Sequence, residues 1–571
     1  MARSIFLFVV AALLASTAAC SDDGADPSGS TDPTASSSHD EPAGTDPREP
    51  AVLCPEGEAG PVDRSDPPTS GADRQVIEGT FDDLVPLPAE VSSGDGSFVI
   101  DQEVVVVAAP PDAEVAACLL RDELARSTGL RLEVAGGDAE ESSPARQIRF
   151  EAGPGGGSSA AGPGHPEGYR LEVSPDLVTI EASTAAGYGW AVQTLIQSAP
   201  AAVHSPFRAE AALAFPTGTV VDAPRFGWRG LMVDIVRHWF GVSDLERVID
   251  LMAGYKLNVL HLHLSDDQGW RVAIDAYPAL TEVGASTQVG GGPGGFLTKD
   301  DYRHLVDYAG RRGITVIPEI DLPGHTNAAL HAIPELNCDG VAPEPYTGTQ
   351  VGFSTLCIGD PAVEEFVRTV LAELAEMTPG PYIHIGGDEA HSTTTADYQA
   401  FIARTLDVVR DLGKVPVGWE EVGTVPGSGE LVAQHWLDAS IAEAAVAGGA
   451  SLVLSPSSVL YFDMAYGEFA PDGNSWAGTT DTREVYDWEP IDQVAVEPSA
   501  ILGVEAAMWT ELIETPDEIS LRLLPRLPAL AEVAWTAQDR RGWANFSTRL
   551  SAHVARWEAA GRPYVDDPGL G

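Results

Sequence analysis

The stretch LNVLHLHLSDDQGW, residues 257–270, begins as an apolar strand-like run and ends in acidic, amide and aromatic side chains. From about Pro224 onward, runs of this kind alternate with helical segments, a pattern typical of βα units in a parallel sheet. There are eight runs: 230–235, 257–264, 314–320, 382–385, 415–418, 431–435, 451–455 and 501–506. Residues 223–571 are therefore predicted to form an α/β fold, a (β/α)8 TIM barrel with insertions.

Residues 75–222, which precede the barrel, are predicted to form a small α+β domain. Short β-rich runs cover residues 98–108, 147–151, 169–173 and 177–181. Two amphipathic segments, 113–128 and 184–198, show the spacing of apolar residues that indicates a helix. Strands and helices mixed in this way suit a sheet covered by helices.

The N-terminal part of the chain carries features of an exported protein. Residues 1–20 have a basic start at Arg3, an apolar run, and small residues before Cys20, as in an export signal. Small residues directly before a cysteine are typical of bacterial lipoproteins, in which Cys20 would be lipidated; an ordinary secretory signal is the alternative. Residues 21–74 are rich in Asp, Ser, Gly and Pro and are predicted to be a disordered acidic linker. We therefore expect a cell-surface lipoprotein or a secreted protein.

The charge balance limits the partners of this protein. The chain has 33 Lys and Arg against 85 Asp and Glu, a formal net charge of −52. Nucleic acids and anionic membranes are bound through clustered cations, so neither is an expected partner. Contact with a membrane is expected only through a lipid anchor at Cys20.

Export makes disulfide bonds possible. Without Cys20, four cysteines remain, and four cysteines allow three pairings. Cys338 and Cys357 bracket one loop rich in Pro, Gly and Thr, so we predict a disulfide between them that holds a loop at the active face of the barrel. Whether Cys54 pairs with Cys118 stays open.

An adjacent pair of carboxylates follows the fourth predicted barrel strand, in His384-Ile-Gly-Gly-Asp388-Glu389. The chemistry of such barrels lies at the C-terminal ends of the strands. Carboxylates suit the hydrolysis of sugars, because one protonates the leaving oxygen while another stabilises positive charge at the anomeric carbon. Close carboxylates also push their pKa values apart, which leaves one able to act as an acid near neutral pH.

Tryptophans mark the same end of the predicted barrel. Eleven of the 12 tryptophans lie after residue 220, which places the aromatic-rich site in the barrel. Trp419, Trp436 and Trp509 follow three different strands. Because the apolar faces of pyranose rings stack on indoles, these residues are candidate walls of a sugar site.

Two other functions fit parts of this pattern. His261, His263 and His325, with nearby aspartates, could be ligands in a metal-dependent hydrolase, which would lose activity with a chelator. That hypothesis leaves the tryptophans and the Asp388–Glu389 pair unexplained, so we predict no metal site. A non-catalytic sugar-binding protein of the same fold would need a substitution at Asp388 or Glu389, and neither is substituted.

Several motifs together resemble the family 20 glycoside hydrolases, the β-N-acetylhexosaminidases, over about residues 168–535. They are EGYRL from Glu167, GYGWAVQTL from Gly187, WRGLMVD from Trp228, and the strand ends quoted above. The resemblance implies a retaining exo-enzyme that hydrolyses terminal N-acetylglucosamine or N-acetylgalactosamine, from chitin fragments or other glycans. Its substrate's own acetamido oxygen would form an oxazolinium intermediate, and no cofactor would be needed.

The resemblance also assigns roles to single residues. Glu389 would be the general acid and then the base, and Asp388 would hold the acetamido N–H. Asp266 and His325 would form a relay that orients Glu389. The implied substrate-binding residues are Arg229, Trp419, Trp436, Tyr461, Asp463, Trp476, Trp509 and Glu511.

Overall fold

The computed structural model describes residue 54 and residues 75–137, 146–153 and 165–570. The predicted export signal with Cys20, and the predicted linker apart from Cys54, lie outside the described residues. None of the helices in the described ranges has the length and apolar character that a membrane span requires.

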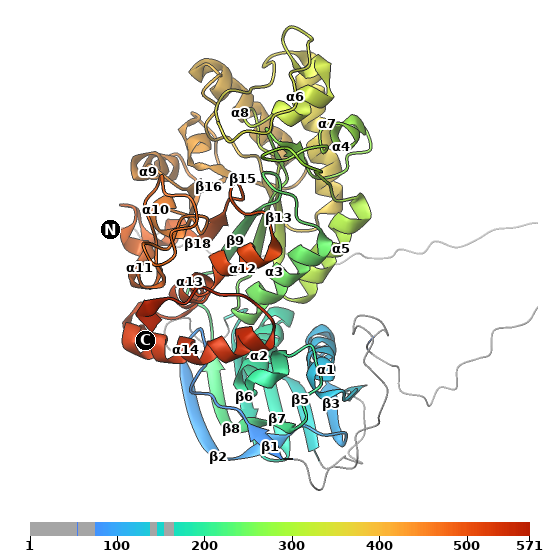
Figure 1. The fold of residues 1–571 in the computed structure, drawn as a ribbon, viewed down its shortest axis with the longest axis vertical. Helices are drawn as coiled ribbons and strands as arrows, with labels where there is room; N and C mark the ends of the chain where they lie inside the picture. Colours follow the sequence, from blue (N-terminus) through green and yellow to red (C-terminus); the bar gives the residue numbers. More distant parts are fainter. Residues whose placement is uncertain (1–53, 55–74, 138–145, 154–164, 571) are drawn as a thin grey trace, which may run out of the picture. The chain divides into compact units, whose positions relative to one another are not determined.

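Eight parallel strands close into a barrel, which confirms the predicted (β/α)8 fold (Figure 1). Each predicted run overlaps one of them, and β9, β15 and β18 extend beyond the predicted runs. The strands are β9 (Trp228–Asp234), β10 (Val259–His263), β13 (Thr315–Glu319), β14 (Tyr382–His384), β15 (Val415–Trp419), β16 (Val432–His435), β17 (Ser451–Leu454) and β18 (Ile501–Met508).

Helices follow the barrel strands, and several begin at residues whose side chains cap them. The larger ones are α3 (Val242–Gly254), α5 (Lys299–Arg311), α7 (Pro361–Met377), α8 (Thr395–Asp411), α9 (Ala439–Ala447), α12 (Pro516–Leu523), α13 (Arg526–Trp535) and α14 (Trp543–Ala559). Thr298, Asp360 and Thr394 each accept a hydrogen bond from the first turn of the helix that they precede. Such caps satisfy N–H groups that have no partner inside the helix.

The barrel interior is built in layers, because inward-facing side chains alternate along each strand. The layer near the N-terminal ends is apolar and includes Trp228, Val259 and Ile317. A polar layer follows, in which His261 contacts Glu319 and Glu505. The last layer is an aromatic cluster at the C-terminal ends of the strands. The polar layer therefore lies directly under the end where barrel chemistry takes place.

A second sheet forms from the residues before the barrel. Its strands are β1 (Val76–Glu78), β2 (Glu90–Val99), β3 (Val104–Ala108), β4 (Glu133–Gly136), β5 (Arg146–Ala152), β6 (Tyr169–Val173), β7 (Leu177–Ala182) and β8 (Ala212–Asp222). They are arranged in the order β1-β8-β6-β7-β5-β3-β4, with β2 also paired to β8. The run predicted over 98–108 is in fact two strands, since a turn after Ile100 separates β2 from β3.

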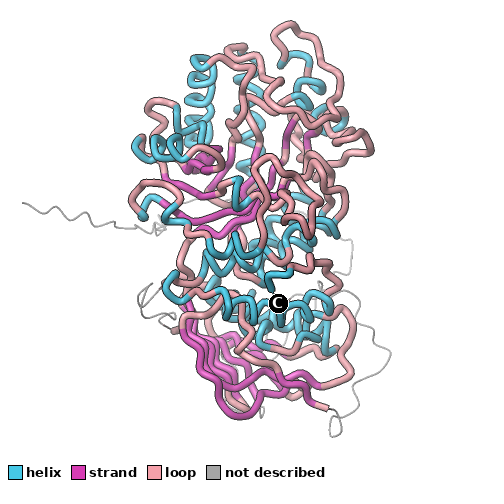
Figure 2. Tube along the Cα trace, turned by 60° about the vertical axis from the view of Figure 1, so that its left-hand side comes forward, coloured by secondary structure: helices cyan, strands magenta, loops and turns pink. Residues whose placement is uncertain are grey.

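Helices α1 (Glu114–Thr128) and α2 (Ala185–Ser198) pack on this second sheet. Figure 2 shows the strands of the two sheets as separate groups with helices between them. Buried polar contacts join the two parts. The Lys256 ammonium lies 3.0 Å from an oxygen of Asp222, and the indole N–H of Trp535 donates to the other oxygen of that carboxylate.

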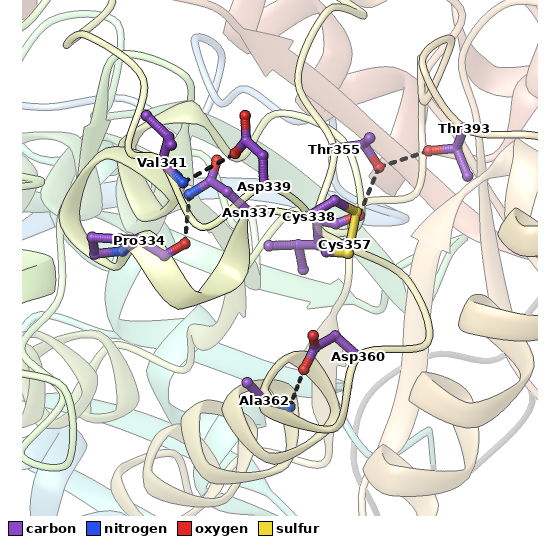
Figure 3. The surroundings of a disulfide bond; sticks show 11 residues. Pro334, Asn337, Cys338, Asp339, Val341, Thr355, Cys357, Asp360, Ala362 and Thr393 are labelled. Atoms are coloured by element: carbon purple, nitrogen blue, oxygen red, sulfur yellow. Dashed lines mark hydrogen bonds between the residues drawn. A yellow bond between two sulfur atoms is a disulfide. The ribbon is translucent and has the colours of Figure 1, made fainter.

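The described cysteines form two disulfides. Cys338 is bonded to Cys357, and Thr355 of the loop between them contacts Thr393 (Figure 3). Cys54, which lies in the predicted linker, is bonded to Cys118 of α1, the pairing that the sequence left open.

Candidate active site

Two glycines carry the chain from β14 to the carboxylate pair. Gly386 and Gly387 have φ angles of 65° and 100°, in the region that favours glycine. A Cβ atom at Gly386 would come within 1.8 Å of Asp321 Oδ1, so no other residue fits there without a shift. This turn sets Asp388 and Glu389 at the C-terminal end of the barrel.

Both Glu389 and His325 have positive φ angles, 45° and 52°. A residue other than glycine is uncommon in this region, and the strain must be offset by its surroundings. The strain therefore falls on two residues of the predicted site.

His325 stands beside both carboxylates. Its Nε2 atom is 3.7 Å from Asp388 Oδ2 and 3.6 Å from Glu389 Oε2. The two acids differ in exposure, since the Asp388 side chain is 11 % exposed and that of Glu389 is 26 % exposed. Glu389 is thus the one more open to an incoming group.

Asp266 and Arg237 form a charged relay that contacts the Nδ1 side of the His325 ring. Its Nδ1 atom is 3.2 Å from Asp266 Oδ1, and the other oxygen of Asp266 accepts from Arg237 at 2.7 Å. Burial opposes the charged imidazolium, but Asp266 and Asp321 raise the pKa of His325 well above its usual value. Burial likewise opposes ionisation of Asp266, but Arg237 and His325 hold the pKa of Asp266 well below its usual value. The predicted pair Asp266–His325 is therefore a buried ion pair next to Glu389.

The surroundings of Asp388 shift its pKa in the opposite direction from that of Asp266. Burial, followed by the nearby Asp321 carboxylate, raises the pKa of Asp388 well above its ordinary value. Burial also raises the pKa of Asp321 to about 7, helped by Glu319. Asp321 Oδ1 accepts a hydrogen bond from the Gly387 N–H, so it fixes the turn as well as the charge. The site thus contains carboxyl groups with well-separated proton affinities.

The predicted aromatic walls come together in the last layer of the barrel. The ring centroids of Trp419 and Trp509 are 5.8 Å apart, and Tyr461 lies 6.2 Å from Trp509. Trp436 stacks on Tyr461 at 6.4 Å. Trp476 is 58 % exposed and meets the Tyr461 ring edge-on at 5.9 Å, so it lies at the rim. These five rings form what we call the aromatic cluster.

Several buried polar atoms near the aromatic cluster have no hydrogen-bond partner among the described residues. They are Asp388 Oδ1, His325 Nε2, Arg237 Nε, Asp463 Oδ1 and Glu511 Oε2. Burial of such an atom without a partner costs free energy, so each one needs an explanation. Together they suit a ligand that carries several donors and acceptors beside an apolar face.

The structure corrects the role predicted for Arg229. This residue lies at the N-terminal start of β9, so Asp234 at the other end is about 17 Å away at about 3.3 Å per residue. Its guanidinium pairs with Glu167 at 2.6 Å and donates to the Lys256 and Phe226 carbonyls. Arg229 thus belongs to the base of the barrel and not to the predicted site.

Arg237 is the arginine that lies at the site, and the sequence analysis missed it. It follows β9, contacts Asp266 and Asp234, and its guanidinium carbon is 4.7 Å from the centre of the Trp509 ring. No periodicity marks Arg237. The signal that could have identified it is its position just after the C-terminal end of β9, where the site residues of such barrels lie.

Glu421 is a second residue that the sequence analysis missed. Its carboxylate accepts from the Trp436 indole N–H at 3.1 Å. Burial and the neighbouring Asp388 raise the pKa of Glu421 to about 8. Glu420 and Glu421 directly follow Trp419. Two adjacent acidic residues after a strand are also typical of a solvent-exposed turn, so the sequence alone does not mark Glu421 as a site residue.

Three groups of residues have ligand atoms close enough for a metal ion. They are His261 with Glu319 and His384, Asp266 with Asp267 and His325, and Asp321 with His325 and Asp388. A histidine binds metal only when it is neutral. Burial favours neutral His261, but Glu319 and Glu505 raise its pKa to about 9, and His325 is also held protonated. Within the described residues these histidines contact carboxylates, and burial lowers the pKa of His384 in the first group.

Comparisons with known proteins agree on one family. Residues 226–398 and 390–538 match "Glycosyl hydrolase family 20, catalytic domain", and residues 82–223 match "Glycosyl hydrolase family 20, domain 2". A β-N-acetylhexosaminidase of Cellulomonas fimi is 42% identical over 499 residues, which are 86% of this chain and 98% of that protein. A β-hexosaminidase of Porphyromonas gingivalis is 32% identical, over 84% of this chain and 64% of that protein.

Solved structures give the same result. A β-N-acetylhexosaminidase from Streptomyces coelicolor has a TM-score of 0.79 and 42% identity, with 86% of this chain and 99% of that chain covered. A mutant β-hexosaminidase from Streptomyces plicatus, in complex with its product GlcNAc, has a TM-score of 0.80 and 42% identity, with 87% and 99% covered.

The new position of Arg229 predicts a structural role. Removing one partner of a buried ion pair leaves the other charge uncompensated, so Arg229→Met should lower the free energy of unfolding by about 3–5 kcal/mol. Urea denaturation measures this change. In the Glu167→Gln background the same substitution should cost less, because the two residues are coupled. If Arg229→Met costs no more than Arg303→Met at an exposed arginine, the role is refuted.

Proposed function

Since the chain belongs to glycosyl hydrolase family 20 and is a β-N-acetylhexosaminidase, we propose that it is a retaining exo-enzyme acting by substrate-assisted catalysis. Its substrates are oligosaccharides or glycoconjugates that end in non-reducing N-acetylglucosamine or N-acetylgalactosamine. Chitin fragments are one such class.

The proposed reaction uses Glu389 twice. The substrate's acetamido oxygen attacks the anomeric carbon while the glycosidic bond breaks, and Glu389 gives its proton to the leaving oxygen. Water then attacks the anomeric carbon on the face that the leaving group left, while the bond from that carbon to the acetamido oxygen breaks. The water gives a proton to Glu389, so the acid is restored and the product keeps the original configuration. The Asp266–His325 ion pair orients Glu389 throughout.

The acetamido group is assigned to Asp388 and Tyr461. Asp388 accepts the acetamido N–H and stabilises the positive charge of the ring that forms, and Tyr461 donates to the acetamido oxygen. Trp419, Trp436 and Trp509 enclose the methyl group and the apolar face of the sugar. Trp476 and Asp463 lie toward the side of the sugar that carries the 6-hydroxyl.

One observation carries the proposal: buried acceptors without partners lie beside the aromatic cluster. Asp388 Oδ1, Asp463 Oδ1 and Glu511 Oε2 each need a donor, and a sugar with an acetamido N–H and hydroxyl groups supplies them. Arg237 interacts electrostatically with Glu511 and packs on Trp509. We therefore assign to Arg237 the substrate-binding role that the sequence analysis gave to Arg229. The proposed chemistry requires no metal or organic cofactor.

We also propose that the protein is exported and carries a lipid on Cys20. The support is the sequence of residues 1–20 and the four paired cysteines, which suit an oxidising compartment. Mass spectrometry of the mature N-terminus in membrane and culture fractions tests this. A chain cut at another residue, without lipid, would contradict lipidation, and retention of residues 1–20 would contradict export.

The function itself predicts a strong dependence on the acetamido group. Turnover of para-nitrophenyl N-acetyl-β-glucosaminide should exceed that of the plain β-glucoside at least about 1,000-fold, because the glucoside lacks the internal nucleophile. Both rates should be unchanged by a chelator. Equal turnover of the two sugars would refute substrate assistance, and loss of activity with the chelator would support the metal-dependent alternative.

Replacement of the general acid should affect substrates unequally. Glu389→Gln should lower kcat/KM about 100- to 10,000-fold for N-acetyl-β-glucosaminides with poor leaving groups, and much less for good ones, which need little acid assistance. A series of aryl substrates measures the dependence on leaving-group pKa. Glu376→Gln, at an exposed glutamate, is the matched control. An equal loss across the series would show that Glu389 is not the acid.

The pH profile should report on Asp388. Only its carboxylate form accepts the acetamido N–H, so kcat/KM should fall as the pH falls through its raised pKa. Asp321→Asn keeps an acceptor for the Gly387 N–H but removes a neighbouring negative charge, which lowers the pKa of Asp388. The acid limb should therefore move to lower pH, while the exposed control Asp300→Asn leaves it in place. A limb that does not move would contradict this assignment.

A further inference from the structure

A cavity of about 270 Å³ lies at the other end of the barrel from the aromatic cluster. It is lined by α1, α2, α3, α14 and a short 3-10 helix, η2 (Ala201–His204). Tyr255, which leads into β10, and Arg312, before β13, also face it. Because these residues precede their strands, the cavity belongs to the N-terminal end, and the proposed hydrolysis does not use it.

The cavity lining is rich in arginine. Five arginines face it, namely Arg126, Arg247, Arg312, Arg556 and Arg562, against two carboxylates, Glu123 and Asp250. The whole chain has a formal net charge of −52, so a positive lining is opposite to the overall charge. Clustered guanidinium groups create a local field that attracts anions.

Both carboxylates are already engaged by two of the five arginines. Glu123 forms an ion pair with Arg126. Asp250 accepts hydrogen bonds from Arg312 Nε at 2.7 Å and from the Tyr308 hydroxyl at 2.9 Å. The remaining arginines therefore have no carboxylate partner inside the cavity.

Among the residues that the structure describes, Arg556 and Arg562 have no carboxylate hydrogen-bonded to them, although Asp83, which does not line the cavity, acts on Arg556 electrostatically. Arg556 is 8 % exposed, and its one side-chain hydrogen bond within the described ranges is with His204 Nε2 at 3.4 Å. Burial and the nearby arginines, Arg556 first, lower the pKa of His204 to about 3, so His204 stays neutral. The Arg562 guanidinium makes no hydrogen bond or ion pair with any described residue, although Asp250 acts on it electrostatically.

Arg247 adds a third guanidinium with a weak partner. It is 3.5 Å from Asp517, and both side chains are well exposed, so this pair contributes little. Burial of guanidinium groups without an anion is costly, whereas a tetrahedral oxyanion can accept two hydrogen bonds from each. A space of about 270 Å³ also exceeds the volume of several waters at about 30 Å³ each.

We propose that this cavity binds a small multivalent oxyanion, phosphate or sulfate, held by Arg247, Arg556 and Arg562. The ion is either free or is the terminal group of an ester. Because η2 and α1 come from the first part of the chain and α3 and α14 from the barrel, the bound ion joins the two parts at a site remote from Glu389. It therefore stabilises the fold without taking part in hydrolysis.

Calorimetry and thermal unfolding of the full chain test the proposal. Protein prepared without phosphate or sulfate is titrated with sodium phosphate, sodium sulfate or glycerol phosphate, against sodium chloride at equal ionic strength. We expect saturable binding and a rise in Tm with at least one oxyanion but not with chloride. Arg562→Gln should weaken binding at least 10-fold. The guanidinium makes no hydrogen bond or ion pair with any described residue, so its replacement breaks no such bond in the fold.

Matched variants separate this site from others. Arg303→Gln removes the same charge from an exposed position and should leave the affinity unchanged, and Arg562→Gln should leave the hydrolysis of N-acetyl-β-glucosaminides unchanged. Binding of the free ions alone identifies a free oxyanion, and equal or tighter binding of glycerol phosphate identifies an ester. Stabilisation no greater than with chloride, or unaltered affinity in Arg562→Gln, would overturn the proposal.

Discussion

One buried carboxylate, Glu319 at the end of β13, supports the rest of the active site. It contacts His261, His263 and His384 and accepts the indole N–H of Trp419. Burial opposes its charge, but the three histidines hold the pKa of Glu319 well below its usual value. His263 also contacts Asp266, and Asp266 in turn contacts His325, so a continuous series of contacts joins Glu319 to His325. An unpaired charge at this depth would be costly, so the whole chain of contacts must form together.

The layered barrel gives its two ends different tasks. At the C-terminal end, the polar layer supports the strained residues His325 and Glu389, and the aromatic cluster lies at the same end of the barrel. At the N-terminal end, an apolar layer seals the interior, and arginines outside it face the helices of the preceding sheet. The apolar layer separates the arginine-lined cavity from the active site. The excess positive charge of the cavity therefore need not alter the pKa values of the active-site carboxyl groups.

The sequence predicted the barrel well because apolar runs with polar ends report strands directly. It also predicted that Asp388, Glu389 and the tryptophans lie at one end of the barrel, because strand ends converge there. It misassigned Arg229 because a motif gives the residue type but not the end of the strand at which it lies. Arg237 and Glu421 lie in turns, where no periodicity marks them. Whether a buried atom such as Glu511 Oε2 has a hydrogen-bond partner depends on the positions of all its neighbours in space. A local sequence pattern does not contain that information.

The backbone of Glu389 has a consequence for how this protein can change over time. Its φ angle of 45° suits glycine better than any residue with a side chain, so a glycine there would relax the turn. Selection for stability alone would thus favour losing the acid. Only the need for catalytic activity opposes substitutions that would make the protein more stable but inactive. Glu389 is therefore a residue at which stability and activity are in direct conflict.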